Sequence, residues 1–366
     1  MANMYTLEQW YHDKEAKFDI SECGMINTLH DSMIYDILKS KMCRVNCYDY
    51  GNVEGNLQLI SLLSEIYHCD KTNILITNGA TEALYLILCC LSKGNTVAYQ
   101  IPYYHDIDHI ILGFGGTPKH IHLKNGIESV VQANNESQKD MDLLILNYPN
   151  NPTGTIIADS EYNQILKLSK RTDMITVFDE VCSDIILNGQ QSYMEHNIGK
   201  NLDNAIVINS LSKSYGIPGV RIGWIVANEK VINKCRTMKE NVSNSTSMFS
   251  QMLALGILEK RDVIIQNNIE ILRSNLMLLV NFMEQNKDIF EFTKPQGGAC
   301  CFVKLKVQIS VHQFCLDLYN KASVLLVPGE YFGYENYFRL GFGIPTNQFE
   351  QAIQLLNEFI DSYFHK

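Results

Sequence analysis

One lysine of the sequence lies in a setting that suits covalent chemistry. Lys213 follows a predicted buried strand and lies among small hydroxyl residues and glycines, within the segment 210–223. A crowded but reachable amine of this kind can form a Schiff base with a carbonyl compound. Ser210, Ser212 and Arg221 can hold a phosphate nearby, the arginine through bidentate charge-assisted hydrogen bonds. Alone, the tripeptide S-K-S also fits an ordinary surface loop.

Three further segments carry groups that suit a bound anion or a polar ring. The turn Asn-Gly-Ala-Thr at 78–81 leads into a predicted helix, whose free N–H groups and positive dipole end form an anion site. The segment 147–154 reads as a polar loop after a strand. Asp179 ends a buried strand, where ligands of open α/β sheets bind. Taken singly, these segments also fit a helix start, a loop and a strand cap.

The elements that must position these groups alternate between strands and helices from about residue 56. A helix is predicted after the turn at 78–81 and another at 160–169. Unbroken apolar runs predict strands at 96–100, 143–147, 175–179, 205–209 and 222–227. Runs of this type are typical of a parallel sheet that is covered on both faces. The fold class is therefore α/β, with a mostly parallel central sheet and helices on both faces.

The pattern changes after about residue 245 and predicts a smaller α+β domain. A long helical stretch at 248–284 precedes short strands near 298–303 and 337–341, and a final helix follows Thr346. At the other end, we expect a helix at 7–17, an irregular segment and a helix at 31–40. The predicted divisions are an N-terminal segment, 1–40, that packs with the small domain at the active-site entrance, a large domain, 41–245, and a small C-terminal domain, 246–366.

Composition excludes several classes of protein. A chain of 366 residues is long enough for two domains. Its net charge of -10, without a basic run, argues against a nucleic-acid partner. The eleven cysteines are odd in number and include no C-x-x-C pair, which predicts reduced thiols, no metal and a cytoplasmic location. The longest apolar run, 83–91, is too short to span a membrane, and we expect neither a signal peptide nor a membrane partner.

In their order along the chain, the four segments resemble the class I/II aminotransferase family of fold type I pyridoxal-phosphate enzymes. The resemblance covers nearly the whole chain and implies pyridoxal 5'-phosphate as the cofactor and an amino acid as the substrate. It implies that Lys213 carries the cofactor and moves the Cα proton of an external aldimine, and that Asp179 pairs with the pyridine nitrogen. Asn151 would hydrogen-bond the phenolic oxygen and help seat the substrate carboxylate.

The same resemblance assigns roles to further residues. Tyr104 would stack on the ring and count among the catalytic residues, with Lys213 and Asp179. Arg339 would clamp the substrate α-carboxylate, which the backbone at Gly24 would border. Tyr50 would reach the phosphate of the neighbouring subunit, which implies a homodimer. The phosphate itself would be held by Gly79, Ala80, Thr81, Ser210, Ser212 and Arg221.

The sequence departs from the family pattern at Cys182, which is expected beside the cofactor. Family members usually place a tyrosine there, and a thiol is a weaker donor. The segments 7–10, 19–24, 211–219 and 327–333 are similar to those of cyclases that form capreomycidine and enduracididine. That similarity implies cyclisation of a hydroxylated L-arginine by loss of water and re-addition of the guanidine.

Two alternatives stay open beside the cyclase. The first is an ordinary aminotransferase that passes the amino group to a keto acid. The second is a regulatory domain that keeps the fold, although the intact Lys213 and the lack of a DNA-binding extension weigh against it. If the substrate carries a guanidinium, acidic partners are needed. We expect these from the N-terminal segment, at Glu8, Asp13, Glu15 and Glu22.

Overall fold

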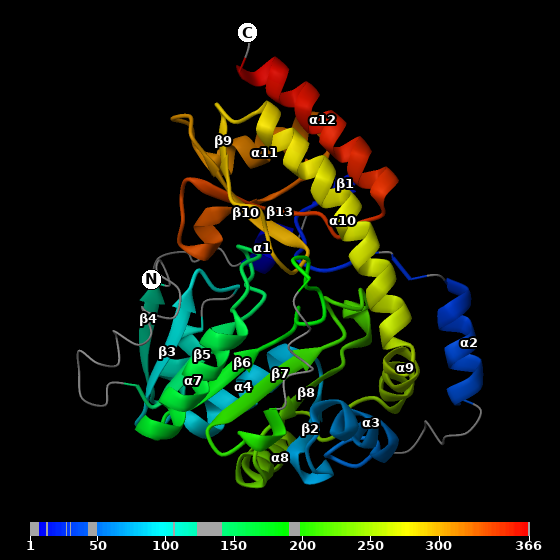
Figure 1. The fold of residues 1–366 in the computed structure, drawn as a ribbon, viewed down its shortest axis with the longest axis vertical. Coiled ribbons are helices and arrows are strands. Elements are labelled where there is room, and N and C mark those ends of the chain that lie inside the picture. Colours follow the sequence, from blue (N-terminus) through cyan, green and yellow to red (C-terminus); the bar gives the residue numbers. More distant parts are fainter. Residues whose placement is uncertain are drawn as a thin grey trace.

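The computed structural model describes residues 7–11, 14–26, 28–29, 31–42, 50–104, 107–122, 141–189 and 198–364. Two bodies built on separate sheets are stacked along the long axis of the molecule (Figure 1). We call them the large-sheet body, which holds strands β2 to β8, and the small-sheet body, which holds strands β9, β10, β12 and β13. Asp13 and the other residues outside these ranges are not described.

The described residues place seven strands in the large sheet, in the order β2-β8-β7-β6-β5-β3-β4. Its strands are β2 (Ile74–Thr77), β3 (Thr96–Ile101), β4 (Thr117–His122), β5 (Leu143–Asn147), β6 (Ile175–Asp179), β7 (Ala205–Ser210) and β8 (Gly223–Val226). The run from β7 to β4 is parallel, which confirms the mostly parallel sheet.

The direction of β8 corrects the expectation of a parallel strand at 222–227. This strand runs antiparallel to both of its neighbours, β7 and β2. The link from β7 to β8, residues 211–222, contains one short 3-10 helix, Pro218–Val220, and no crossover helix. A parallel return would require such a crossover, so the chain turns back as an antiparallel pair. Lys213 lies on this link.

Successive residues of each central strand point into two different cores. On β5, Leu143 and Ile145 belong to one core and Leu144 and Leu146 to the other. The first core is closed by α4 (Ala80–Leu91), α5 (Asp108–Gly113) and α8 (Glu229–Val242). The second is closed by α3 (Leu57–Tyr67), α7 (Asp159–Thr172) and α9 (Met248–Leu258). Helices therefore cover both faces, as the unbroken apolar strands predict.

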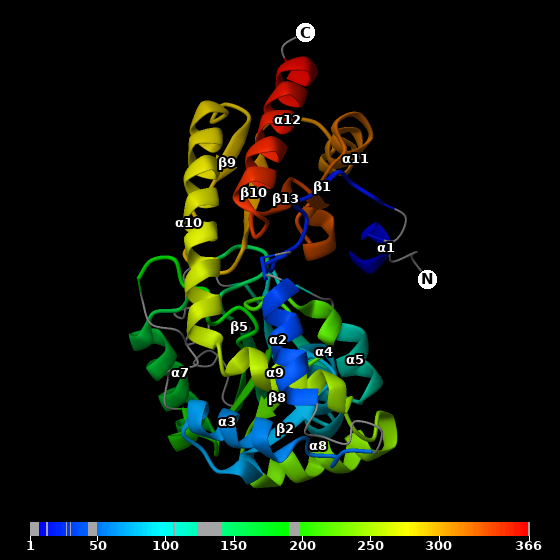
Figure 2. The same ribbon diagram turned by 90° about the vertical axis from the view of Figure 1, so that its right-hand side faces the viewer.

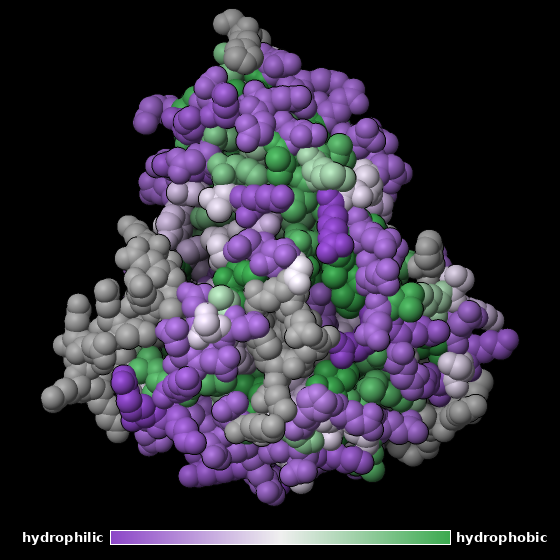
Figure 3. Space-filling model, in the orientation of Figure 1, coloured by the Kyte–Doolittle hydropathy of each residue, from purple (hydrophilic) through white to green (hydrophobic). Residues whose placement is uncertain are grey.

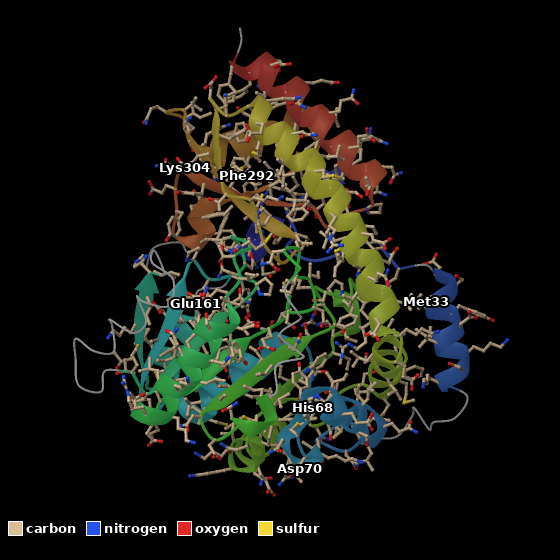
Figure 4. The ribbon with its side chains drawn as sticks, in the orientation of Figure 1. Met33, His68, Asp70, Glu161, Phe292 and Lys304 are labelled. Carbon is tan, nitrogen blue, oxygen red and sulfur yellow. The ribbon has the colours of Figure 1, made fainter. Side chains whose placement is uncertain are left out.

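The small-sheet body contains an antiparallel sheet in the order β12-β13-β10-β9. Its elements are β9 (Phe290–Phe292), β10 (Cys300–Leu305), α11 (Val311–Ala322), β11 (Val324–Leu325), β12 (Val327–Pro328), β13 (Tyr337–Gly341) and α12 (Thr346–Phe364). The register pairs Lys304 with Glu291 and Val303 with Phe292 (Figure 4, where Phe292 and Lys304 are labelled).

The predicted helical stretch at 248–284 is present, but the chain divides it into two helices. Helix α9 ends at Leu258, and α10 (Arg261–Gln285) starts in a new direction and runs up to the small-sheet body (Figure 1). The two helices bury different faces. Leu255 of α9 lies in a core of the large-sheet body, whereas Leu279 of α10 lies in that of the small-sheet body. Ile264, near the start of α10, still lies in the core of the large-sheet body, so α10 itself connects the two bodies.

The N-terminal segment divides between the two bodies (Figure 2). Its first helix is shorter than the expected 7–17, because α1 (Leu7–Tyr11) gives way to an extended strand, β1 (Phe18–Asp19), that pairs with β11. Phe18 is buried in the core of the small-sheet body. Helix α2 (Asp31–Met42) packs on α9, with Ile37 in a core of the large-sheet body. The boundaries at 40 and 245 stay predictions.

Hydrophilic residues cover most of the face seen in Figure 3, and apolar residues show in the recesses between them. Over the ranges that the structure describes, no helix is both long and apolar enough to cross a membrane. The cysteines in those ranges are free thiols, and no group of three or more His, Cys, Asp or Glu side chains there could hold a metal ion.

Candidate active site

A cavity of about 390 Å³ opens where the carboxyl ends of β5, β6 and β7 meet the start of α4. Its lining also includes the N-terminal segment and the small-sheet body. The structure brings most of the predicted site residues together here. Those that line the cavity are Glu8, Glu22, Ala80, Thr81, Tyr104, Asn151, Asp179, Cys182, Ser210, Ser212, Lys213, Arg221 and Arg339.

Lys213 projects from the link after β7 and forms an ion pair with Glu22. Its Nζ lies 2.9 Å from Glu22 Oε2. The N-terminal segment is held against this link by the N–H of Met25, which donates to the Lys213 carbonyl at 2.9 Å. A Cβ on Gly24 would lie 2.7 Å from Lys213 Cδ, so the close approach requires a glycine. The predicted border residue Gly24 thus packs on the lysine itself.

The charge of Lys213 is stabilised in this setting. Burial by itself acts to lower the pKa of Lys213. Cys23, Glu22 and the hydrogen bond to Glu22 outweigh burial, and the pKa lies above its usual range. Lys213 in turn lowers the pKa of Glu22. The amine is therefore held as an ammonium until its partner changes.

Asp179 ends β6 and points its carboxylate into the cavity from a buried position. The Tyr103 hydroxyl donates to Asp179 Oδ2 at 3.1 Å, and the Val181 N–H donates to Oδ1 at 3.4 Å. Burial raises the pKa of Asp179 to about 7. A cationic ring nitrogen in the cavity would counter that burial and hold the carboxylate ionised.

An anion cradle forms at the start of α4. Gly79 precedes the helix with φ 82° and has no side chain to cap it, which leaves the first-turn N–H groups for a ligand. The Arg221 guanidinium donates to the carbonyls of Pro218 and Asn78. A side chain at this positive φ would be strained, and a Cβ on Gly79, 2.6 Å from Arg221 Nη2, would also push the guanidinium aside. With Ser210 and Ser212 beside them, these donors fit a phosphate.

Arg339 reaches the cavity from β13 and is only 2% exposed. Its Nε donates to the Ser21 carbonyl at 2.9 Å, its Nη1 donates to Asn151 Oδ1 at 2.9 Å, and its Nη2 donates to the Tyr11 hydroxyl. These partners are neutral, and no described carboxylate forms an ion pair with Arg339. Glu22 acts on Arg339 only through space, and a buried guanidinium without an ion-pair partner is suited to an anionic ligand.

Cys182 lines the cavity close to two further buried thiols, those of Cys23 and Cys300. The Asn151 amide donates to the Sγ of Cys23 at 3.2 Å, and the thiol of Cys300 approaches Pro152 O at 3.6 Å. Burial raises the pKa of Cys182 and of Cys300 above the usual range, so both stay neutral. The thiols on this side of the cavity are weak donors.

Some predicted residues lie elsewhere, and some neighbours of the site were not predicted. Tyr50 is 88% exposed and is not part of the cavity, and Glu15 is exposed and does not line it. Sequence reasoning missed Tyr11 and Cys23, which line the cavity, and Tyr103, which contacts Asp179. The only sequence signal for Tyr103 is its place directly before Tyr104.

Comparisons with known proteins agree on one family. The family described as "Aminotransferase class I and II" matches residues 44–356. An aspartate aminotransferase of Sulfolobus acidocaldarius is 26% identical over 329 residues, which is 85% of this chain and 81% of that protein. A capreomycidine synthase of Streptomyces vinaceus is 23% identical over 367 residues, covering 98% of this chain and 94% of that protein.

Solved structures share the fold. The PLP-dependent cyclase OrfR superposes with a TM-score of 0.89 at 24% identity, covering 98% of this chain and 97% of that one. A PLP-dependent aminotransferase from Streptococcus suis gives a TM-score of 0.85 at 25% identity, covering 95% and 94%. The fold is therefore that of the PLP-dependent enzymes of this group.

Proposed function

Because the chain belongs to the class I and II aminotransferase family, we propose that it cyclises a hydroxylated L-arginine with loss of water. The chain is a PLP-dependent enzyme that acts on an amino acid, and its cofactor is pyridoxal 5'-phosphate. When bound, the cofactor supplies an electron sink for the charge that develops at the substrate Cα. The remaining argument concerns what the side chains of this chain do.

The cavity residues have the donors that the cofactor requires. The first turn of α4, with Ser210, Ser212 and Arg221, would hold the phosphate. Lys213 would carry the cofactor, and its Nζ would take and return the substrate Cα proton. Asp179 would pair with the pyridine nitrogen. Asn151 would hydrogen-bond the phenolic oxygen beside Cys182, and Tyr104 would stack on the ring.

The single observation that carries the substrate assignment is the charge pattern of the cavity. Arg339 provides a buried cation that forms no ion pair with a described carboxylate, which suits an α-carboxylate. Glu8 and Glu22 line the same cavity from the N-terminal segment and would supply acidic partners for a distal cation, Glu22 once Lys213 carries the cofactor and no longer pairs with it. A substrate with a carboxylate at one end and a guanidinium at the other satisfies both. Similarity to a capreomycidine synthase over 98% of the chain supports the same substrate class.

The atoms of the proposed reaction balance without a second substrate. The proton from Cα passes to Lys213 Nζ, which gives a proton to the departing side-chain hydroxyl, so that water leaves and a carbon–carbon double bond forms. A guanidine nitrogen then adds to that double bond, and the proton that this nitrogen loses is returned to Cα through Lys213 Nζ. The amine is retained, so the product is the substrate less one water.

Mass spectrometry of the products tests this assignment. Hydroxylated arginine should give a product lighter by one water, whether or not a keto acid is present. Glu8→Gln and Glu22→Gln should weaken binding of this substrate more than binding of the cofactor. Failure of hydroxylated arginine to react, together with rapid conversion of an unmodified amino acid to its keto acid, would refute the cyclase.

An ordinary aminotransferase is the second candidate. It is favoured by the aspartate aminotransferase of Sulfolobus acidocaldarius, which is 26% identical over 85% of this chain. Both reactions would use Lys213, Asp179 and Arg339 in the same way up to removal of the Cα proton. A strict requirement for a keto acid in the product assay would identify this alternative.

We also propose a homodimer. Tyr50 is 88% exposed and lies outside the cavity of its own chain, so it is free to reach the partner's phosphate site. Leu57 and Phe249 are also exposed, at 65% and 46%, and such apolar side chains are typical of an interface. Analytical ultracentrifugation should find a dimer, and an active monomer would contradict the proposal.

A further inference from the structure

We propose that Tyr103 is a positioning residue that keeps Asp179 ionised and aligned for the pyridine nitrogen of the cofactor. The inference rests on the proposed pairing of Asp179 with that nitrogen. It adds a residue that neither the family pattern nor the comparisons assign. Tyr103 acts through Asp179, since it does not line the cavity itself.

The contact is buried and fixed from both sides. The Tyr103 hydroxyl donates to Asp179 Oδ2 at 3.1 Å, and both residues are 2% exposed. The ring of Tyr103 lies between those of Tyr99 and Tyr104, at centroid distances of 5.7 and 4.9 Å. Because packed rings hold its torsions, the hydroxyl has one place to point.

The hydrogen bond selects one protonation state of Asp179. A phenol can donate to a carboxylate oxygen, and that bond stabilises the charged acceptor. Burial acts in the opposite sense and raises the pKa of Asp179 to about 7, against which Tyr103 and the more distant Val181 N–H act. The other titratable groups that face Asp179 are Tyr104, Glu180 and Cys182. None of these donates a hydrogen bond to its carboxylate among the described contacts.

Removal of the Tyr103 hydroxyl should therefore favour the protonated form of Asp179. Without Tyr103 as donor, the pKa of Asp179 rises further, and at neutral pH more of the carboxyl is protonated. A neutral carboxyl cannot supply the negative charge that stabilises a protonated ring nitrogen. The loss should be largest at low pH and should shrink as pH rises, because a high pH ionises Asp179 even without the donor.

The neighbouring Tyr99 provides a matched control. It is also a buried tyrosine, 3% exposed, and its ring packs against that of Tyr103. Its hydroxyl, however, donates to Asp108 at 2.9 Å and contacts His120. Tyr99→Phe therefore removes a buried hydroxyl from the same aromatic cluster without removing a donor to Asp179.

The experiment measures the dissociation constant of pyridoxal 5'-phosphate from cofactor-free protein by tryptophan fluorescence between pH 5.5 and 8.5. Tyr103→Phe should weaken binding about ten- to hundredfold at neutral pH, the range for a hydrogen bond to a charged group. The midpoint of its pH profile should also move to higher pH. Tyr99→Phe should stay within about twofold of wild type, with an unchanged midpoint. Equal effects of the two variants, or a Tyr103→Phe loss that does not vary with pH, would overturn the proposal.

Asp179→Asn separates this inference from the function on which it rests. With Asn at position 179, Tyr103→Phe should hardly lower the affinity for pyridoxal 5'-phosphate, because the charged acceptor of the hydrogen bond is gone. A full additive loss in the double variant would overturn the role of Tyr103 alone. If Asp179→Asn itself leaves cofactor affinity and its pH profile unchanged, the proposed pairing of Asp179 fails as well.

Discussion

Replacement of Glu22 by glutamine should speed covalent attachment of the cofactor to Lys213. Attachment requires an uncharged amine, and the Glu22 carboxylate holds the Lys213 ammonium at 2.9 Å. The side chains of the pair are 27% and 35% exposed, between a surface pair and a buried one. Exposed pairs contribute up to about 1 kcal/mol, and breaking buried ones costs about 3 kcal/mol or more. An intermediate value of about 1.4 kcal/mol corresponds to about one pKa unit for Lys213.

That shift predicts the size of the kinetic effect. Well below its pKa, the uncharged fraction of an amine rises about tenfold for each unit by which the pKa falls. Glu22→Gln should therefore attach the cofactor about tenfold faster at a given pH, and the advantage should disappear only at high pH.

Stopped-flow absorbance of cofactor-free protein mixed with pyridoxal 5'-phosphate at pH 6.5 to 8.5 measures this rate. Glu8→Gln is the matched control, because Glu8 lines the same cavity, whereas the described ion pair of Lys213 is with Glu22. It should stay within about twofold of wild type. If Glu22→Gln attaches the cofactor no faster than Glu8→Gln does, Glu22 does not govern the charge of the lysine.

Three further outcomes are expected. Lys213→Ala should still bind pyridoxal 5'-phosphate but should not be labelled after borohydride reduction, as mass spectrometry of the intact protein would show; labelling at another lysine would contradict the assignment. Glu180 is 2% exposed, and burial raises its pKa to about 8, so the folded state retains a proton that the unfolded chain releases above its ordinary pKa of 4.5. Its contribution to stability is therefore lost as pH rises from about 4.5 to 8. Over that range the free energy of unfolding in urea should fall by about 2 kcal/mol or more for wild type relative to Glu180→Gln. Parallel pH profiles of the two proteins would exclude Glu180 as the cause. A Cβ on Gly223 would lie 2.6 Å from the Gly79 carbonyl carbon and 2.7 Å from the Ala80 nitrogen, so Gly223→Ala should displace the anion cradle and lower cofactor affinity at least tenfold. Gly219→Ala is the control, because a Cβ there meets nothing within 4 Å and should leave the affinity unchanged. Equal affinities of the two variants in a calorimetric titration would show that the cradle tolerates the displacement.

Much of the large sheet could be predicted from the sequence. The strands at 143–147 and 175–179, and the small-sheet strand at 337–341, match their observed bounds, because each is a compact run of strand-forming residues that ends at polar or turn-forming ones. The antiparallel direction of β8 could not be predicted, because strand composition does not encode direction when both faces are buried. The break between α9 and α10 could not be predicted either, because residues 259–260 include no Gly or Pro.

Some residues of the candidate site could be predicted from the sequence, and others could not. Residues in contiguous segments, such as Lys213 and Asp179, could be found because their neighbours in sequence are also their neighbours in space. Tyr11 could not, because it meets Arg339 only after the first helix folds onto the last strand of the small sheet. Contacts of that range depend on tertiary packing, which no local pattern reports.

The division of the N-terminal segment has a mechanical consequence. The segment is fastened to the small-sheet body by the Gly341 N–H, which donates to the Ile20 carbonyl at 2.7 Å. Five residues later it is fastened to the link of the large-sheet body through Met25. Glu22 lies on the short span between these two anchors. The residue after Met25, Ile26, donates to the Gly343 carbonyl at 2.8 Å, so the small-sheet body holds this segment on both sides of Glu22. A rotation of one body against the other would therefore move Glu22 together with Arg339 relative to Lys213, which couples ligand binding by Arg339 to the ion pair of Lys213.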